Sequence, residues 1–96
     1  MKMFLIIYCE AADEHVIAAL KEAGIHSYTK TVEARGEGTE TEPKLGTHCW
    51  PGKNNILLIA ADDGEVPRIN ERIRRIKKEY PRAGLRSFLL PMEEII

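Results

Sequence analysis

Arginine and glycine residues stand close together at two places in the sequence. In the first place, Arg35, Gly36 and Gly38 fall within four residues, and two glycines let the backbone take positive φ and turn its N–H groups toward an anion. The second group is Arg82, Gly84 and Arg86. Guanidinium groups grip phosphates and carboxylates through paired hydrogen bonds. The two groups have two interpretations, an anion-binding cleft across a subunit boundary or a tight turn with solvated arginines.

A second kind of chemistry is suggested by His48 and Cys49, which are adjacent. Imidazole and thiolate are ligands for zinc and copper, but a complete shell needs further donors, for which the chain offers His15, His26 and Cys9. Two adjacent ligands make no metal motif, so solvated loop residues are the alternative. The two cysteines have no spacing typical of a disulfide framework or a zinc ribbon, and we expect reduced thiols.

These loop residues belong to a long polar stretch, residues 33–55. Connections of more than about a dozen residues without their own secondary structure are usually functional or disordered. Trp50 is the only tryptophan of the chain and lies near the end of this stretch. It could anchor a partner protein or fold back onto its own chain.

Composition and charge argue against several classes of protein. The chain has 96 residues, enough for one domain over residues 1–96, and its net charge of −1 favours neither nucleic acid nor an anionic membrane. The first apolar run, residues 3–8, is too short for a membrane span or a signal peptide. No Ser/His/Asp set, Walker loop or cofactor fingerprint is present. We expect a cytoplasmic protein that is not an enzyme and binds no nucleic acid.

Hydrophobic periodicity divides the remaining sequence into six elements. The predicted strands cover residues 1–9, 25–34, 55–61 and 85–90, and the predicted helices cover residues 11–23 and 66–80. The first and third strands are apolar throughout, which is typical of central strands. In both helices apolar residues recur at steps of three and four, as in an amphipathic helix.

The order β-α-β-β-α-β predicts a ferredoxin-like α+β sandwich. Its four-stranded antiparallel sheet carries both helices on one face, and the long polar stretch connects the second and third strands. The other face of the sheet then has no helix to cover it. Because a domain of this size gains from burying that face against another copy, we expect a homo-oligomer.

Residues 32–38, VEARGEG, resemble the T-E-V-R-G-F-G segment that opens the T-loop of the PII nitrogen-regulatory signalling proteins. Glu33, Arg35, Gly36 and Gly38 match at identical spacing. The resemblance extends to the strand order, the loop length and the Asp-rich start of the second helix. It implies a homotrimer that binds a small effector between subunits. It also implies that the T-loop-like segment, residues 36–52, docks on a partner protein such as a transporter or an enzyme.

The chain also departs from the pattern of the PII family. Thr39 and Glu40 stand where the family has an Arg and a Gln, the Gln helping to hold magnesium and 2-oxoglutarate. Residues 79–84 replace the glycine-rich phosphate-binding B-loop, and the later family arginines have no counterpart. The resemblance therefore implies a PII-like relative whose effector is ATP, ADP, AMP, another small anion or a divalent metal.

From the residues and the resemblance together we predict two sets of site residues. The predicted effector-binding set is Arg35, Gly36, Gly38, Glu40, Arg82, Gly84 and Arg86, and the predicted partner-binding set is Glu37, Thr39 and Trp50. The alternative function is that of a trimeric divalent-metal-binding or metal-tolerance protein of the CutA type, with His48 and Cys49 as ligands. CutA proteins share the trimeric fold, although their signature around the third strand is not evident in this sequence.

Overall fold

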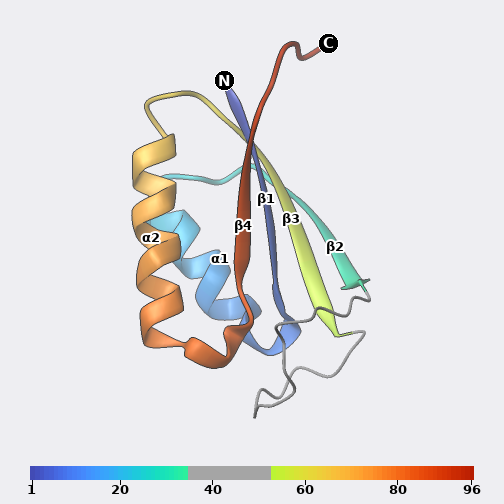
Figure 1. Ribbon diagram of the computed structural model, residues 1–96, viewed down its shortest axis with the longest axis vertical. Helices are drawn as coiled ribbons and strands as arrows, with labels where there is room; N and C mark the ends of the chain where they lie inside the picture. Colours follow the sequence, from blue (N-terminus) through green and yellow to red (C-terminus); the bar gives the residue numbers. More distant parts are fainter. Residues whose placement is uncertain (35–52) are drawn as a thin grey trace.

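The computed structural model describes residues 1–34 and 53–96 and contains one sheet and two helices (Figure 1). The elements in chain order are β1 (Lys2–Cys9), the 3₁₀ turn η1 (Glu10–Ala12), α1 (Asp13–Glu22), β2 (Thr29–Ala34), β3 (Asn54–Ala61), α2 (Val66–Glu79), the 3₁₀ turn η3 (Pro81–Ala83) and β4 (Arg86–Pro91). All six predicted elements are confirmed. The second strand is shorter than predicted, because Gly24 takes a φ of 86° and Ile25 turns into the core before β2 begins.

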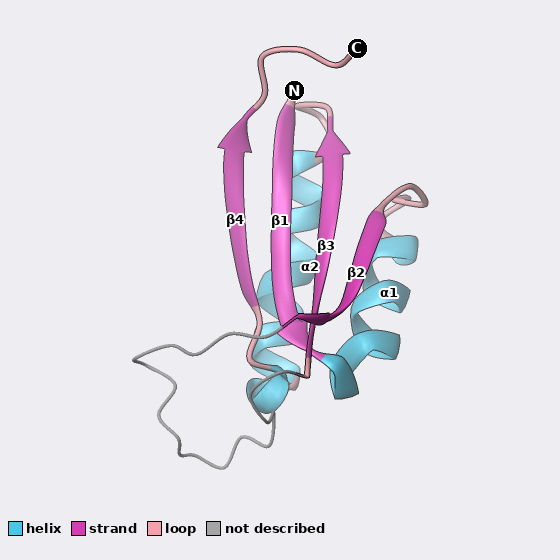
Figure 2. Ribbon diagram, turned by 90° about the vertical axis from the view of Figure 1, so that its right-hand side faces the viewer, coloured by secondary structure: helices cyan, strands magenta, loops and turns pink. Residues whose placement is uncertain are grey.

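The strand order β2-β3-β1-β4, with every pair antiparallel, confirms the ferredoxin-like sheet. β1 and β3 are the central strands, as their continuous apolar sequences predicted. Both helices cover the same face of the sheet, and Figure 2 looks onto the opposite face, with the helices behind the strands. The register pairs Leu5 of β1 with Leu58 of β3 on one side and with Phe88 of β4 on the other.

The core lies between the sheet and the two helices. Alternate residues of the central strands point toward the helices, since successive side chains of a strand face opposite sides. The buried set includes Phe4, Ile6, Tyr8, Leu57 and Ile59 from the strands and Val16, Leu20, Ile69, Ile73 and Ile76 from the helices. Each large apolar side chain buried in this way contributes about 1.5–3 kcal/mol. The apolar residues that recur at steps of three and four in each helix are therefore the ones that pack on the sheet.

The opposite face of the sheet, which we call the open face, is also apolar. It is formed by Met3, Leu5, Ile7, Ile56, Leu58, Phe88 and Leu90, which the strand register places on the side away from Phe4 and Leu57. Phe88 and Leu90 of β4 are 47% and 45% exposed. No described helix covers this face.

The second helix begins with a reciprocal pair of hydrogen bonds. The Glu65 backbone N–H donates to Asp62 Oδ1 at 3.1 Å, and the Asp62 N–H donates to Glu65 Oε1 at 3.0 Å. The two bonds satisfy backbone donors in the turn that leads into α2 at Val66. Neither α1 nor α2 has the length and apolarity that crossing a membrane requires, and no other described segment forms a longer helix.

Candidate functional site

The strands that border the long connection meet at one end of the sheet, which we call the loop-bearing end. Ala34 is the last residue of β2 and pairs with Asn54, the first residue of β3. Asn54 also pairs with Cys9 at the end of β1, and β4 begins nearby at Arg86, which pairs with Ile7. Residues from all four strands therefore lie at this end of the sheet.

Three predicted effector-binding residues lie together at this end. Arg82 belongs to η3, Gly84 follows the turn, and Arg86 begins β4. Gly84 has a left-handed φ of 62°, which a glycine adopts without the cost that a Cβ atom would impose. Both arginines are exposed. Their part in effector binding stays a prediction.

A cavity of about 400 Å³ lies beside Arg82, which is one of its lining residues. One wall comes from the connection between β1 and α1, and the other comes from the segment between α2 and β4. Its lining residues are Cys9, Ala11, Ala12, His15, Tyr80, Pro81, Arg82 and Ala83. Apolar walls with few polar groups are typical of small-ligand sites, and the volume is within their usual range of about 300–1,000 Å³. The sequence analysis missed this cavity because alanines carry no recognisable chemical signal.

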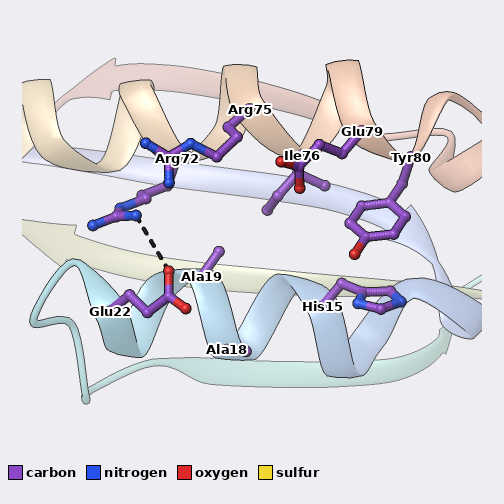
Figure 3. A pocket seen from close by; sticks show the side chains of 9 residues that line it. All are labelled: His15, Ala18, Ala19, Glu22, Arg72, Arg75, Ile76, Glu79 and Tyr80. Carbon is purple, nitrogen blue, oxygen red and sulfur yellow. Dashed lines mark hydrogen bonds and ion pairs between the residues drawn. The ribbon is translucent and has the colours of Figure 1, made fainter.

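A groove of about 350 Å³ runs between α1 and α2 (Figure 3). The rings of His15 and Tyr80 stack at one end, with centroids 4.0 Å apart and an interplanar angle of 16°. Glu22 accepts a hydrogen bond from Arg72 at the other end, at 3.2 Å. Both stacked rings also line the cavity at the loop-bearing end, so the stack separates the two hollows.

Polar side chains from three strands converge on the carboxylate of Asp13, the first residue of α1. Asp13 Oδ1 accepts hydrogen bonds from the Tyr8 hydroxyl at 2.6 Å and from Asn55 Nδ2 at 3.2 Å. Asp13 Oδ2 accepts one from Lys30 Nζ at 2.9 Å. We call these four residues the Asp13 cluster. It connects β1, α1, β2 and β3, and the sequence analysis did not find it, because Lys30 and Asn55 are far from Asp13 in the sequence.

The protonation states of the Asp13 cluster follow from its contacts. Partial burial opposes ionisation of Asp13, but the hydrogen bonds from Tyr8, Lys30 and Asn55 outweigh it and lower the pKa of its carboxyl. The hydrogen bond to Asp13 raises the pKa of Lys30. Burial, followed by the bond to Asp13, raises the pKa of Tyr8. At neutral pH the cluster is therefore a carboxylate held by one ammonium group and two neutral donors.

Two features at the loop-bearing end carry an energetic cost. Glu33, next to last in β2, has a φ of 58°, and the pairing of β2 with β3 shifts register between Thr31 and Ala34. A non-glycine residue in this conformation costs about 1–3 kcal/mol. Among the described residues, the buried Oδ1 atom of Asn55 has no hydrogen-bond partner, which also costs free energy.

Several predicted site residues lie outside the described part of the chain. They are Arg35, Gly36, Glu37, Gly38, Thr39, Glu40, His48, Cys49 and Trp50. Within residues 1–34 and 53–96 no group of three or more His, Cys, Asp and Glu side chains could hold a metal ion. The predicted metal site at His48 and Cys49, and with it the CutA-like alternative, stays a prediction.

The expectation of reduced thiols is wrong for Cys9, which is disulfide-bonded. Cysteine spacing along the chain did not reveal this bond, because spacing carries no information on which strands become neighbours. In the sheet Cys9 pairs with Asn54, which follows Lys53 directly after the undescribed part of the chain. The other cysteine of the sequence, Cys49, lies outside the described residues.

Comparison with known proteins now adds to this geometry. The family model described as Nitrogen regulatory protein P-II matches residues 1–96. This chain belongs to the PII family. PII proteins are regulatory, and the match spans the loop-bearing end, the Asp13 cluster and both helices. The sequence matches no curated protein.

Solved structures of PII-like proteins share the fold. CPII of Thiomonas intermedia K12 bound to ADP and bicarbonate is 19% identical, with a TM-score of 0.68 over 92% of this chain and 81% of that one. The same protein bound to ADP, AMP and acetate is 18% identical, with a TM-score of 0.71 over 93% and 82%. A PII-like signalling protein of Thermus thermophilus is 23% identical, with a TM-score of 0.64 over 92% and 82%. These likenesses support the ferredoxin-like PII fold.

Proposed function

We infer that this protein is a PII-like signalling protein that binds an adenine nucleotide or a small anion at the loop-bearing end and regulates a partner protein. The observation that carries the proposal is the cavity beside Arg82, in a chain that matches the PII family over its whole length. Structures of CPII bound to ADP, AMP and bicarbonate support the choice of effector. A cytoplasmic location belongs to the same proposal.

The described residues offer two kinds of contact to such an effector. Arg82 and Arg86 supply guanidinium groups for a phosphate or a carboxylate, and charge-assisted bonds of this kind are the stronger hydrogen bonds of proteins. Ala11, Ala12 and Pro81 supply apolar surface for a flat ring. Arg35, Gly36, Gly38 and Glu40 complete the proposed site.

The open face supports the proposed trimer. Phe88 and Leu90 expose apolar surface next to Leu5 and Leu58, and a contiguous apolar patch on a small domain marks an interaction site. Packing of the open face between copies would remove this patch from water. The helices would then face outward, and the loop-bearing ends of neighbouring subunits would contribute to shared clefts.

Regulation requires that the effector favours one arrangement of residues 36–52 over another. Such coupling amounts to about 1–3 kcal/mol in typical allosteric proteins. Glu37, Thr39 and Trp50 are the proposed partner contacts, and the partner would be a transporter or an enzyme.

Calorimetric titration with ADP, AMP, ATP with magnesium, and bicarbonate tests the proposal. Arg82→Gln or Arg86→Gln should weaken binding about tenfold, the effect of losing one charge-assisted contact. Arg74→Gln is the matched control, since Arg74 is an exposed cation of α2 that lines neither hollow. The proposal is wrong if none of these compounds binds at millimolar concentration, or if the three variants bind equally well.

A further inference from the structure

Asp13 contacts both strands that border the long connection. Lys30 belongs to β2, which ends at Ala34, and Asn55 is the second residue of β3. The two side chains reach the same carboxylate, at 2.9 Å and 3.2 Å. One residue of α1 therefore bonds to the strand before the connection and to the strand after it.

Asp13 is also joined directly to a wall of the cavity. It follows η1, and Ala11 and Ala12 of that turn line the cavity together with His15, two residues after Asp13. The Asp13 backbone N–H donates to the Glu10 carbonyl, so the turn and the helix start form one hydrogen-bonded unit. The Glu10 N–H in turn donates to the Lys53 carbonyl at 2.8 Å, beside the start of β3.

We propose that Asp13 is the positioning residue through which a ligand in the cavity acts on β2 and β3. A ligand that packs against Ala11 and Ala12 shifts η1, and the shift reaches Lys30 and Asn55 through the two oxygens of Asp13. This proposal rests on the proposed function, because it assigns the route by which effector binding changes the strands that carry residues 35–52.

The loop-bearing end has the properties that such a route needs. Coupling works when an element has two arrangements of similar free energy. Glu33 with its left-handed backbone, the register shift after Thr31 and the buried, unpartnered Asn55 Oδ1 each raise the free energy of the described arrangement. The proposal requires a second arrangement of β2 against β3 in which these costs are relieved and the contacts to Asp13 are lost.

Hydrogen exchange of the protein without ligand tests the positioning role first. In Asp13→Asn, amide exchange should rise about tenfold or more in both β2 and β3, while β4 exchanges as before. Lys30→Gln should raise amide exchange in β2 alone. This variant keeps the test informative if Asp13→Asn does not fold. Glu14→Gln, an exposed neighbour in α1, is the control and should change neither strand. Unchanged exchange in β2 of both cluster variants would overturn the proposal.

The second measurement adds ADP as the probe. In the unmodified protein ADP should slow amide exchange in β2 and β3. In Asp13→Asn the affinity for ADP should stay within about threefold of that of the unmodified protein, but ADP should slow exchange in neither strand. Asp13→Glu, which keeps a carboxylate, should regain part of the protection. Equal protection in Asp13→Asn would refute the coupling and leave nucleotide binding intact. If ADP does not bind the unmodified protein, the proposed nucleotide binding is wrong, and so is the proposed coupling between the cavity and Asp13.

Discussion

The Tyr8 hydroxyl donates a hydrogen bond of 2.6 Å to Asp13 Oδ1, which joins the end of β1 to the first residue of α1. Tyr8 is fully buried, and its ring belongs to the core between the sheet and the helices. The same contact therefore links the hydrophobic core to the polar cluster at the loop-bearing end. Its removal should affect both stability and the geometry of that end.

Tyr8→Phe should lower the free energy of unfolding by about 1–3 kcal/mol. The ring and its packing are kept, whereas the bond to a charged acceptor is lost. Urea denaturation followed by circular dichroism measures the change. Tyr80→Phe keeps the stack with His15 and should change stability by less than about 0.5 kcal/mol. Equal stability of Tyr8→Phe and the unmodified protein would contradict the strong hydrogen bond.

Stability should fall with acid because of Asp13. The pKa of the Asp13 carboxyl is lowered in the folded chain, whereas in the unfolded chain it has the ordinary value of about 3.9. Near pH 4 the unfolded chain therefore binds more protons than the folded one. The contribution is complete above that value and is lost as the pH falls through the folded pKa. Urea midpoints from pH 7 to pH 2 measure this slope, which should be smaller in Asp13→Asn. Parallel curves for the two proteins would contradict the lowered pKa.

Stability should also fall in alkaline solution, because of Lys30 and Tyr8 in the same cluster. The pKa values of Lys30 and Tyr8 are raised in the folded chain, so above about pH 10 the unfolded chain loses these protons first. The stabilisation is complete below that pH and declines as the pH rises. Lys30→Gln should reduce the decline, measured by thermal unfolding between pH 8 and pH 11, and the exposed Lys78→Gln should not.

Gly84→Ala should destabilise the fold by about 1–2 kcal/mol, because an L residue at a φ of 62° is strained. Crowding is not the cause, since an added Cβ would meet no described atom within 4 Å. Gly64→Ala is the matched control. Gly64 has no positive φ, and its added Cβ would make an ordinary contact with Asp62 at 3.6 Å. Equal unfolding midpoints for the two variants would show that the Gly84 backbone is not strained.

Phe88→Asp should break the proposed trimer into monomers, because it places a charge on the apolar open face, beside Leu5. Ultracentrifugation at several concentrations gives the mass. Ile95→Asp is the control, because Ile95 is 60% exposed but lies beyond β4. A trimer that survives the change at Phe88 would place the interface elsewhere.

The secondary structure and the strand order could be predicted from the sequence because they depend on local patterns. Unbroken apolar runs mark β1 and β3 as central, and three- and four-residue spacing marks the two helices, whose periodicity is set by backbone geometry alone. The motif from Glu33 to Gly38 predicted the PII family, since a short segment of defined spacing is visible without a fold. Arg82, Gly84 and Arg86 stand close together because they are neighbours in the chain, and their role in binding stays a prediction.

The Asp13 cluster, the cavity and the disulfide of Cys9 were decided by tertiary structure. Lys30 is 17 residues from Asp13 and Asn55 is 42 residues away, and only the pairing of strands and the packing of α1 bring them to one carboxylate. Ala11 and Ala12 form a cavity wall because of what lies opposite them, not because of their own chemistry. Local residue types therefore determined which elements form, while contacts between distant residues determined where a ligand could bind and what it could move.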